Sequence, residues 1–481
     1  MSAYDKYEIV IGLEVHAQLS TASKMYCSDN ASFGSSPNTN LSPITLGHPG
    51  TLPKVNKTAI DSAIKMGLAT NCKITAYNGF ARKNYFYADL PKGYQITQDK
   101  TPICTAGHLD IHVNEQVKTI GITRIHLEED AGKSTHDLDP YNSLIDLNRA
   151  GVPLIEIVSE PDMRSSEEAY QYLIEIRKLL RYLEICDGNM EEGSMRCDAN
   201  ISVRLKGAKE FGERCEVKNM NSMRNVARAI EFEARRQIDL IEQGGIIDQQ
   251  TRSFNAADGS TFTLRSKENA NDYRYFPEPD LPPFVVSDAK VASIKALMPK
   301  LSSELFQEYT EKYGLSAYDA NIISEDKYVA KYYNEIISHT SNYKAAANWL
   351  LGPVKSYLNE KAVEIKEFPI AAEKIAQIIG LIEDAKLNFT TASLNLFPAL
   401  LSKPDSNLLA LATELNIIQN SDSSEIEKYV DAVLAELPEK VAEYKAGKSG
   451  LMGLFMGQVM KKSGGKADPK LATKILNEKL K

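Results

Sequence analysis

One change in the spacing of apolar residues divides this chain of 481 residues. Up to about residue 292, apolar and polar residues alternate in short runs that Gly, Pro and Asn interrupt, which is typical of β-strands joined by turns. From Ser287 onward the apolar residues recur at helical spacing with few turn signals. The change follows a cluster of four prolines, which can continue neither a helix nor a central strand. These are Pro277, Pro279, Pro282 and Pro283.

These patterns predict an α+β protein. The first part is expected to form a mostly antiparallel sheet, with one clear helix that begins at the capping box of Ser165 and Glu168. A second break, Lys-Pro-Asp-Ser-Asn at 403–407, divides the helical part. We therefore expect three domains: a sheet-based domain at 1–292, an all-α domain at 293–404 and a small helical tail at 405–481.

The composition is that of an ordinary globular protein, with 43% hydrophobic and 25% charged residues. No apolar run approaches the ~20 residues that span a bilayer, and the polar start of the chain does not resemble a signal peptide. The six cysteines are scattered singly and form no CxxC pair, so neither a zinc knuckle nor a disulfide framework is indicated. We therefore expect a cytoplasmic protein that contacts no membrane.

The charge is uneven along the chain. The net charge is −8, which argues against a surface built for nonspecific nucleic-acid binding. Residues 440–481, however, hold ten Lys against three Asp and Glu, so the tail is basic on an otherwise acidic protein. Such a tail is expected to bind a polyanion. The alternative is a solvated Lys-rich helix.

Four strand-like stretches place ionisable or amide side chains at alternate positions, mostly with apolar residues between them. They are Glu14 and His16 in 7–19; Arg124, His126, Glu128 and Asp130 in 120–130; Arg196, Asp198, Asn200 and Arg204 in 193–205; and Arg214, Glu216 and Lys218 in 213–220. Successive strand side chains point to opposite faces, so each set projects from one face. One explanation is a sheet with one face in water. The other is a polar site on a concave face.

A site of this composition suits one kind of chemistry. Several carboxylates on a concave face can hold Mg²⁺, which takes oxygen ligands, keeps several waters and shares substrate phosphates. Mg²⁺ beside Lys and Arg is what phosphoryl transfer requires, because the migrating group must be positioned and its charge neutralised. His16 is an unusual ligand for Mg²⁺ and suits Mn²⁺, Zn²⁺ or a supporting role.

Three further features have two interpretations each. Lys92, which Gly follows, stands at a turn that could present a cation and an amide to an anion, or could be a plain hairpin turn. The Gly-Lys-Ser run at 132–134 resembles the end of a phosphate-binding loop, but Leu127 stands where that motif needs Gly. Tyr273, Tyr275 and Phe276 are either core residues or part of a nucleotide platform.

The chain shows no motif for releasing ammonia. It has no GxSxG sequence, no stretch that resembles an amidase Ser-Lys site, and no cysteine with the local sequence of a glutaminase nucleophile. If the reaction consumes ammonia, a partner is expected to supply it.

Eight long blocks, in order, resemble the GatB family, one of the subunit types of the tRNA-dependent amidotransferases. They include Ile-Gly-Leu-Glu-Val-His at 11–16, Leu-Gly-His-Pro-Gly-Thr-Leu-Pro at 46–53 and Asp-Leu-Pro-Lys-Gly-Tyr-Gln at 89–95. The others lie at 126–133, 146–156, 193–200, 216–222 and 272–283, and residues 457–460 and 464–467 resemble the family's tail. Eight blocks in family order are specific, whereas a single tripeptide would not be.

The resemblance implies a catalytic cradle domain, a helical domain and a tail similar to the YqeY proteins. It implies a ligase that forms carbon–nitrogen bonds with glutamine as amide donor. ATP phosphorylates the side-chain carboxylate of Glu-tRNA(Gln) or Asp-tRNA(Asn), and ammonia displaces the phosphate. The glutaminase subunit supplies the ammonia, and a third subunit helps to hold the other two together in a heterotrimer. Misacylated tRNA is expected to contact the cradle and the tail, and no DNA is involved.

The resemblance also implies the site residues. The metal ligands correspond to Glu14, His16 and Glu128, and the alternation of side chains adds two acids to the catalytic set, Asp198 and Glu216. ATP and Mg²⁺ are the expected cofactors. The cations expected to contact ATP are Lys92, Lys133, Arg149, Arg196 and Lys218.

Two points depart from this simple assignment. Many family members bind zinc through a cysteine pair near 42–45, but here that stretch is Ser-Pro-Ile-Thr, so zinc is not expected. Two rival functions also stay open: a noncatalytic tRNA-binding scaffold and a free-standing metallohydrolase. A scaffold has no use for converging acids, and a hydrolase would act without tRNA or partners.

Overall fold

The computed structural model describes residues 3–114, 116–136, 138–266, 273–419, 423–464 and 466–481. The chain forms two compact units, Met1–Leu301 and Ser302–Lys481. The first unit is built on a sheet and the second from helices, so the α+β prediction is confirmed. Within the described ranges, no helix is long and apolar enough to cross a bilayer.

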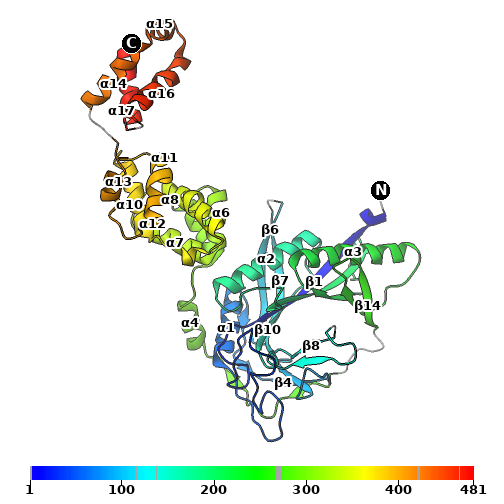
Figure 1. The fold of residues 1–481 in the computed structure, drawn as a ribbon. Helices are drawn as coiled ribbons and strands as arrows, with labels where there is room; N and C mark the ends of the chain where they lie inside the picture. The colour runs from blue at the N-terminus through cyan, green and yellow to red at the C-terminus, as the bar shows by residue number, and fades with distance from the viewer. Residues whose placement is uncertain (1–2, 115, 137, 267–272, 420–422, 465) are drawn as a thin grey trace. The chain divides into compact units, whose positions relative to one another are not determined.

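A nine-stranded sheet forms the centre of the first unit (Figure 1). Its order is β14 (Thr261–Ser266), β13 (Gln250–Phe254), β12 (Cys215–Met220), β11 (Met195–Leu205), β1 (Tyr7–Gln18), β10 (Pro153–Ser159), β7 (Gln116–Glu129), β6 (Cys104–Val113) and β2 (Lys73–Ile74). Neighbouring strands are antiparallel except β12 and β13, which are parallel. The N-terminal strand therefore lies in the middle of the sheet, between strands from much later in the chain.

Helices cover the apolar face of this sheet. Figure 1 shows α2 (Ser166–Tyr182) and α3 (Met223–Glu242) on one side of the sheet. The alternation in β1 explains the arrangement, because Ile11, Leu13 and Val15 point into this core and are fully buried. The cap of α2 is as predicted, since the Ser165 side chain accepts a hydrogen bond from the Glu168 amide. A third helix, α1 (Lys57–Ala69), also contacts β6 and β7.

Three small sheets complete the first unit. β4 (Ala81–Asn84) pairs with β5 (Tyr94–Thr97) and β15 (Phe276–Pro277), β8 (Lys133–Thr135) with β9 (Leu144–Asp146), and β3 (Tyr77–Asn78) with β16 (Phe284–Val285). β4 and β8 lie on the side of the large sheet away from α2 and α3 (Figure 1). They leave the polar face of the large sheet as the floor of a cradle.

The predicted limit at residue 292 falls inside a helix. α4 (Asp288–Ala296) crosses it, and Ile294 is buried in the apolar core of the first unit. Met298 and Leu301 pack against the same core. The first compact unit therefore continues to Leu301 because these apolar side chains need its core.

The second unit contains two groups of helices. The first comprises α5 (Ser302–Glu311), α6 (Ala317–Glu325), α7 (Lys327–Ile337), α8 (Tyr343–Trp349), α9 (Lys355–Lys361), α10 (Ala372–Glu383), α11 (Phe389–Thr391), α12 (Phe397–Ser402) and α13 (Leu408–Glu414). The second comprises α14 (Ser423–Glu436), α15 (Pro438–Lys445), α16 (Met452–Lys462) and α17 (Pro469–Leu480), with a core of its own around Val430, Phe455 and Leu476. α13 contacts α10 and α12, although the predicted tail domain at 405–481 includes it.

Candidate active site

The polar side chains of the central strands share one face of the sheet, as their alternation predicts. Across the pair of β1 and β11, Glu14 lies opposite Asp198. Across β1 and β10, His16 lies opposite Glu156. Directly opposed residues of antiparallel strands project to the same side of the sheet. The register therefore gathers acids that are far apart in the sequence.

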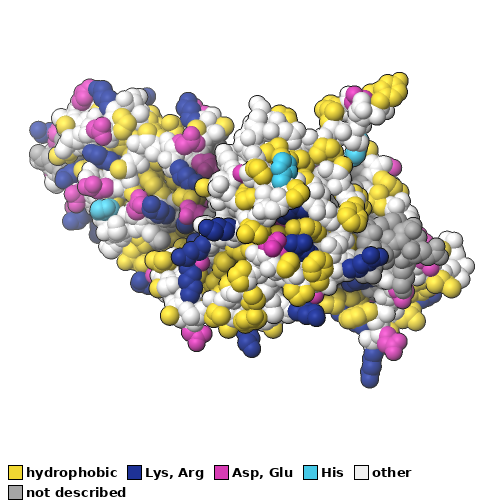
Figure 2. Space-filling model, turned by 90° about the horizontal axis from the view of Figure 1, so that it is seen from below, with side chains coloured by type: hydrophobic (Ala, Val, Ile, Leu, Met, Phe, Trp, Pro, Cys, Tyr) yellow, Lys and Arg dark blue, Asp and Glu magenta, His cyan; other side chains and the backbone are white. Residues whose placement is uncertain are grey.

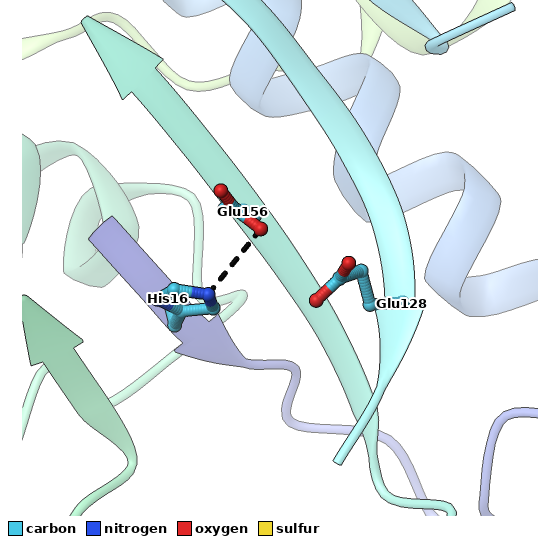
Figure 3. Close-up of side chains that lie close together, drawn as sticks. All are labelled: His16, Glu128 and Glu156. Atoms are coloured by element: carbon cyan, nitrogen blue, oxygen red, sulfur yellow. Dashed lines mark ion pairs between the residues drawn. The ribbon is translucent and has the colours of Figure 1, made fainter. Parts of the chain in front are cut away.

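The first cluster consists of His16, Glu128 and Glu156, from β1, β7 and β10 (Figure 3). One ligand atom from each residue lies within 4.8 Å of the others. His16 Nε2 is 3.3 Å from Glu156 Oε2, and both carboxylates are buried. Two oxygen donors and one imidazole at this spacing are a ligand set for a divalent cation.

Neighbouring polar groups orient the first cluster. His126 Nε2 lies 3.1 Å from Glu128 Oε1 and 3.4 Å from Glu156 Oε2. Thr97 Oγ1 donates to Glu128 Oε1 over 2.8 Å, and Gln95 Nε2 lies 3.3 Å from Glu128 Oε2. These contacts lock the Glu128 carboxylate in position, as a catalytic constellation requires.

Buried charges in the first cluster are balanced by the two histidines. Burial disfavours protonated His126, but the hydrogen bonds and charges of Glu128 and Glu156 raise its pKa to about 9. Burial opposes ionised Glu156 too, yet the charges of His16 and His126 hold its pKa well below the usual range. The carboxylates are therefore ionised at neutral pH.

The second cluster consists of Glu14, Asp198 and Glu216, whose ligand atoms also lie within 4.8 Å of one another. Lys218 forms ion pairs with Asp198 and, over 2.8 Å, with Glu216 Oε1. Asn200 Nδ2 donates to Glu14 Oε1 over 2.9 Å. Burial, followed by the charges of neighbouring acids, raises the pKa of Glu14. Three carboxylates with one ammonium leave this cluster short of positive charge.

The structure thus divides the five predicted catalytic residues between two clusters. Glu14, predicted as a metal ligand with His16 and Glu128, groups with Asp198 and Glu216 instead. Glu156 was not predicted. One signal could have revealed it, because Glu156 is the only ionisable residue of the strand Pro153–Ser159, and a lone acid in an apolar strand needs a partner.

The five predicted ATP-contacting cations lie in different environments. Lys218 joins the second cluster, as described above. Arg196 Nη1 donates to Asp130 Oδ2 over 2.9 Å, and Arg149 donates to the carbonyls of Ala131 and Gly132. Lys92 forms an ion pair with Glu129, and Lys133 is exposed in β8. Burial opposes ionisation of Glu128, but His126 and, to a smaller extent, an unpredicted cation, Lys83 of β4, lower its pKa.

A cavity of about 440 Å³ adjoins the second cluster. Glu14 and Asn200 form its polar wall, and Val158, Pro161 and Phe211 are among its apolar residues. An apolar recess with amide and carboxylate groups at one end is a common form of a small-molecule site.

The stretch Ser-Pro-Ile-Thr at 42–45, where the sequence predicts no zinc site, is held by hydrogen bonds. Thr45 Oγ1 donates to Asp29 Oδ2 over 2.5 Å, and the Ser42 amide donates to the same oxygen over 2.8 Å. Cys27 Sγ lies 3.4 Å from Thr45 Oγ1. Protein groups therefore satisfy the Asp29 carboxylate and the Thr45 hydroxyl, whereas Ser42 Oγ is buried and has no hydrogen-bond partner among the described residues.

Comparisons with known proteins place this architecture in a family. A model described as the GatB/GatE catalytic domain matches residues 9–292, and a GatB domain model matches residues 331–480. The B-type subunit of the aspartyl/glutamyl-tRNA(Asn/Gln) amidotransferase of Caldicellulosiruptor bescii is 47% identical over 478 residues, 99% of each chain. Proteins of the same name from Syntrophotalea carbinolica and Oleidesulfovibrio alaskensis are 48% and 49% identical, again over 99% of each chain.

The chain belongs to the GatB family of amidotransferase subunits. The match to the family's catalytic-domain model includes every residue of the two carboxylate clusters. The second family model spans most of the helical unit, including both groups of helices from α8 onward. The predicted family is thereby confirmed.

Proposed function

We propose that this chain is the phosphorylating subunit of a tRNA-dependent amidotransferase. It catalyses transfer of the γ-phosphoryl group of ATP to the side-chain carboxylate of Glu-tRNA(Gln) or Asp-tRNA(Asn). Ammonia then attacks the acyl phosphate, phosphate leaves, and the amide forms. The observation that carries the proposal is the pair of carboxylate clusters on the floor of the cradle, within the match to the family's catalytic domain.

The donor set of the first cluster fits Mg²⁺ or Mn²⁺, with Glu128, Glu156 and His16 as the residues that would hold it. The bound cation would neutralise charge on the transferred phosphoryl group. Thr97 and His126 fix the Glu128 carboxylate, so the site is set before the substrates arrive. Lys83 adds positive charge near Glu128, and Lys218 adds positive charge in the second cluster.

The cavity beside Glu14 suits the nucleoside of ATP. Its volume of about 440 Å³ accepts a purine nucleoside, and its apolar residues favour a flat ring. Asn200 and Gln249 line it and offer amides to the base or the ribose. ATP bound there would direct its phosphates toward the clusters.

Ammonia would come from a partner, the glutaminase of a heterotrimer whose third subunit helps to hold the other two together. The family name denotes one subunit of several, and the sequence offers no amide-hydrolysing motif. We place the complex in the cytoplasm, where aminoacyl-tRNA is used. A noncatalytic scaffold is the alternative, but the buried carboxylates of the first cluster and the half-buried ones of the second would then cost stability without a use.

The purified heterotrimer with the substitution Glu128→Gln tests the proposal. Ammonium salts replace glutamine in the assay, so that only activation and amidation are measured. We expect ATP-dependent amidation to fall by about 1,000-fold, because the variant loses a charge that the site needs in the transition state. Binding of misacylated tRNA should stay within twofold of wild type. Full amidation by the variant would show that the first cluster does not carry the reaction.

A further inference from the structure

Four tyrosines form a continuous group where β4 ends and β15 begins. The ring centroids of Tyr85 and Tyr87 are 5.7 Å apart, those of Tyr85 and Tyr273 are 6.0 Å apart, and those of Tyr273 and Tyr275 are 6.0 Å apart. Tyr87 is 58% exposed and Tyr275 is 42% exposed. We call these four residues the aromatic platform. Tyr85 and Tyr273 are half-buried, whereas the exposed rings of Tyr87 and Tyr275 are not core residues, and a contiguous aromatic group with exposed rings is a candidate binding surface.

Hydrogen bonds of the backbone and of side chains hold the pair Tyr85 and Tyr87 next to the pair Tyr273 and Tyr275. The Asn84 amide donates to the Tyr273 carbonyl over 3.0 Å, and Asn84 Nδ2 donates to the Arg274 carbonyl over 2.9 Å. Arg82 Nε donates to Glu278 Oε2 over 2.7 Å and so joins β4 to the segment after β15. Arg274 has φ +43°, a left-handed conformation that costs energy for this residue. The surrounding contacts therefore hold the platform in one shape.

The aromatic platform borders the first carboxylate cluster. Lys83 Nζ lies 4.9 Å from the centroid of the Tyr273 ring, and the same ammonium lies in the field of Glu128 and Glu156. β5, which pairs with β4, supplies the Thr97 hydroxyl that binds Glu128. A ligand stacked on the platform would therefore have one end at the cluster.

We propose that the aromatic platform stacks the unpaired nucleotides at the 3′ end of the aminoacyl-tRNA. The inference rests on the proposed function, which requires the esterified amino acid to reach the first cluster. Because the amino acid is attached to the terminal ribose, the terminal base must lie next to the cluster, where the platform is. Unstacked bases bind well to aromatic side chains, and such stacking does not depend on sequence.

The surroundings of the platform fit a nucleic-acid end. Lys83 offers positive charge to the backbone beside rings that accept bases, a combination that single-strand sites share. Figure 2 views the molecule from below, the side on which Figure 1 places β4, and shows hydrophobic side chains, a class that includes Tyr, among those of Lys and Arg.

Two variants of the heterotrimer, Tyr87→Ala and Tyr275→Ala, test the inference by equilibrium binding. The affinity of each variant and of wild type is measured, without ATP, for two forms of deacylated tRNA. One form is intact and the other lacks the terminal adenosine. In wild type, removal of the adenosine should weaken binding roughly tenfold, the value of one stacked base. In at least one variant, intact tRNA should already bind roughly tenfold more weakly, and removal of the adenosine should change little further. Tyr87→Phe and Tyr275→Phe should match wild type.

Tyr77→Ala is the matched control, since Tyr77 is an exposed tyrosine of β3 outside the platform. The inference is wrong if both alanine variants keep the wild-type ratio between intact and shortened tRNA, or if they lose their partner proteins instead of tRNA affinity. A tRNA that ends in 2-aminopurine gives a second measurement on the unmodified complex, because the fluorescence of this base should be quenched on binding. Since neither measurement involves ATP, failure of the platform is distinguishable from failure of phosphoryl transfer, which the amidation assay reports.

Discussion

At the residue scale, Glu156 connects the two carboxylate clusters. Its Oε2 atom lies 3.3 Å from His16 Nε2 and 3.4 Å from His126 Nε2, and its charge also raises the pKa of Glu14. One acid therefore affects both the proposed metal ligands and the second cluster. Such shared charges make individual residues of a site depend strongly on one another.

Replacing Glu156 by Gln should lower kcat by at least about 100-fold, because the first cluster loses a charged oxygen ligand. The Mg²⁺ concentration that gives half-maximal activity should rise. Steady-state amidation with ammonium salts, measured over a Mg²⁺ series, checks both effects. Glu160→Gln is the matched control, since Glu160 lies just beyond β10 and binds the exposed Thr123. Equal activity of the two variants would remove Glu156 from the site.

Lys218→Met should destabilise the first unit in the absence of divalent cations. The variant leaves Glu14, Asp198 and Glu216 close together without their ammonium. We expect Tm to fall by roughly 2–6 °C, since one unpaired charge cluster costs about 1–2 kcal/mol at a partly exposed site. Added Mg²⁺ should restore part of the loss. Differential scanning calorimetry of the variant with and without Mg²⁺ measures this, and Lys206→Met, an exposed lysine, is the control. A Tm that Mg²⁺ does not raise would mean that the second cluster holds no cation.

At the element scale, α3 is attached to the sheet edge by a buried ion-pair network. Glu233 of α3 is fully buried and lies 2.6 Å from Arg236 Nη2 and 3.2 Å from Arg252 Nε of β13. Thr261 of β14 donates to the same carboxylate over 3.0 Å. Burial opposes ionisation of Glu233, but its hydrogen bonds to Arg236 and Gln237 outweigh this and lower its pKa. One side chain thus joins a helix to two strands.

Glu233→Ala should cost about 3–5 kcal/mol of unfolding free energy, because it leaves Arg252 buried without its partner. Since the folded pKa is lower than the unfolded value of 4.5, the contribution of Glu233 is complete above pH 4.5 and is lost as the pH falls through the folded pKa. Denaturant unfolding of wild type and Glu233→Gln should therefore show a difference in unfolding free energy that becomes smaller at acid pH. Glu231→Gln, in the exposed part of α3, should show no such difference. A difference in unfolding free energy that does not change with pH would contradict a lowered pKa of Glu233 in the folded state.

At the scale of the whole molecule, the basic tail is less basic as a folded body than as a stretch of sequence. The residues 423–481 that form the last four helices hold eleven Lys against eight Asp and Glu. Lys462 pairs with Glu436 over 2.6 Å, and Lys479 pairs with Glu427 over 2.7 Å. The acids of α14 therefore offset part of the charge counted in 440–481, and tRNA binding by the tail stays a prediction.

Ending the chain at Gln419 should weaken tRNA binding and make it less dependent on salt, because fewer phosphates are neutralised. ATP binding should not change. A truncation at 405 is unsuitable, since it removes α13, whose residues Leu411 and Ala412 are buried. Filter binding over a salt series measures both quantities. If the affinity for tRNA and its dependence on salt concentration do not change, the lysines of the tail are solvated and do not bind tRNA.

A set of point variants separates charge from folding in the same assay. Lys470 and Lys474 form no ion pair with any described residue, whereas Lys479 pairs with Glu427 and Asp431. The double variant Lys470→Gln and Lys474→Gln should weaken tRNA binding about threefold to tenfold at low salt. Lys479→Gln should change it less. A larger loss of tRNA affinity for Lys479→Gln than for the double variant would show that the helix face with the ion-paired Lys479 contacts the tRNA.

The sequence alone determined the fold class, the family and the polar face of the sheet. These follow from local patterns, because alternation along one strand decides which side chains share a face whatever lies beside it. Glu14, His16, Glu128, Asp198 and Glu216 all lie on that face. Their roles, like those of the predicted ATP-binding cations, stay predictions.

Only the tertiary structure decided how these residues are grouped. Whether Glu14 neighbours Glu128 or Asp198 depends on strand order and register, and β1 lies between β10 and β11, which are far from it in sequence. The same pairing brought Glu156 to His16, and apolar contacts with the core kept α4 with the first unit. The physical reason is that pairing between distant strands is selected by the burial of the whole apolar face, which no local pattern contains.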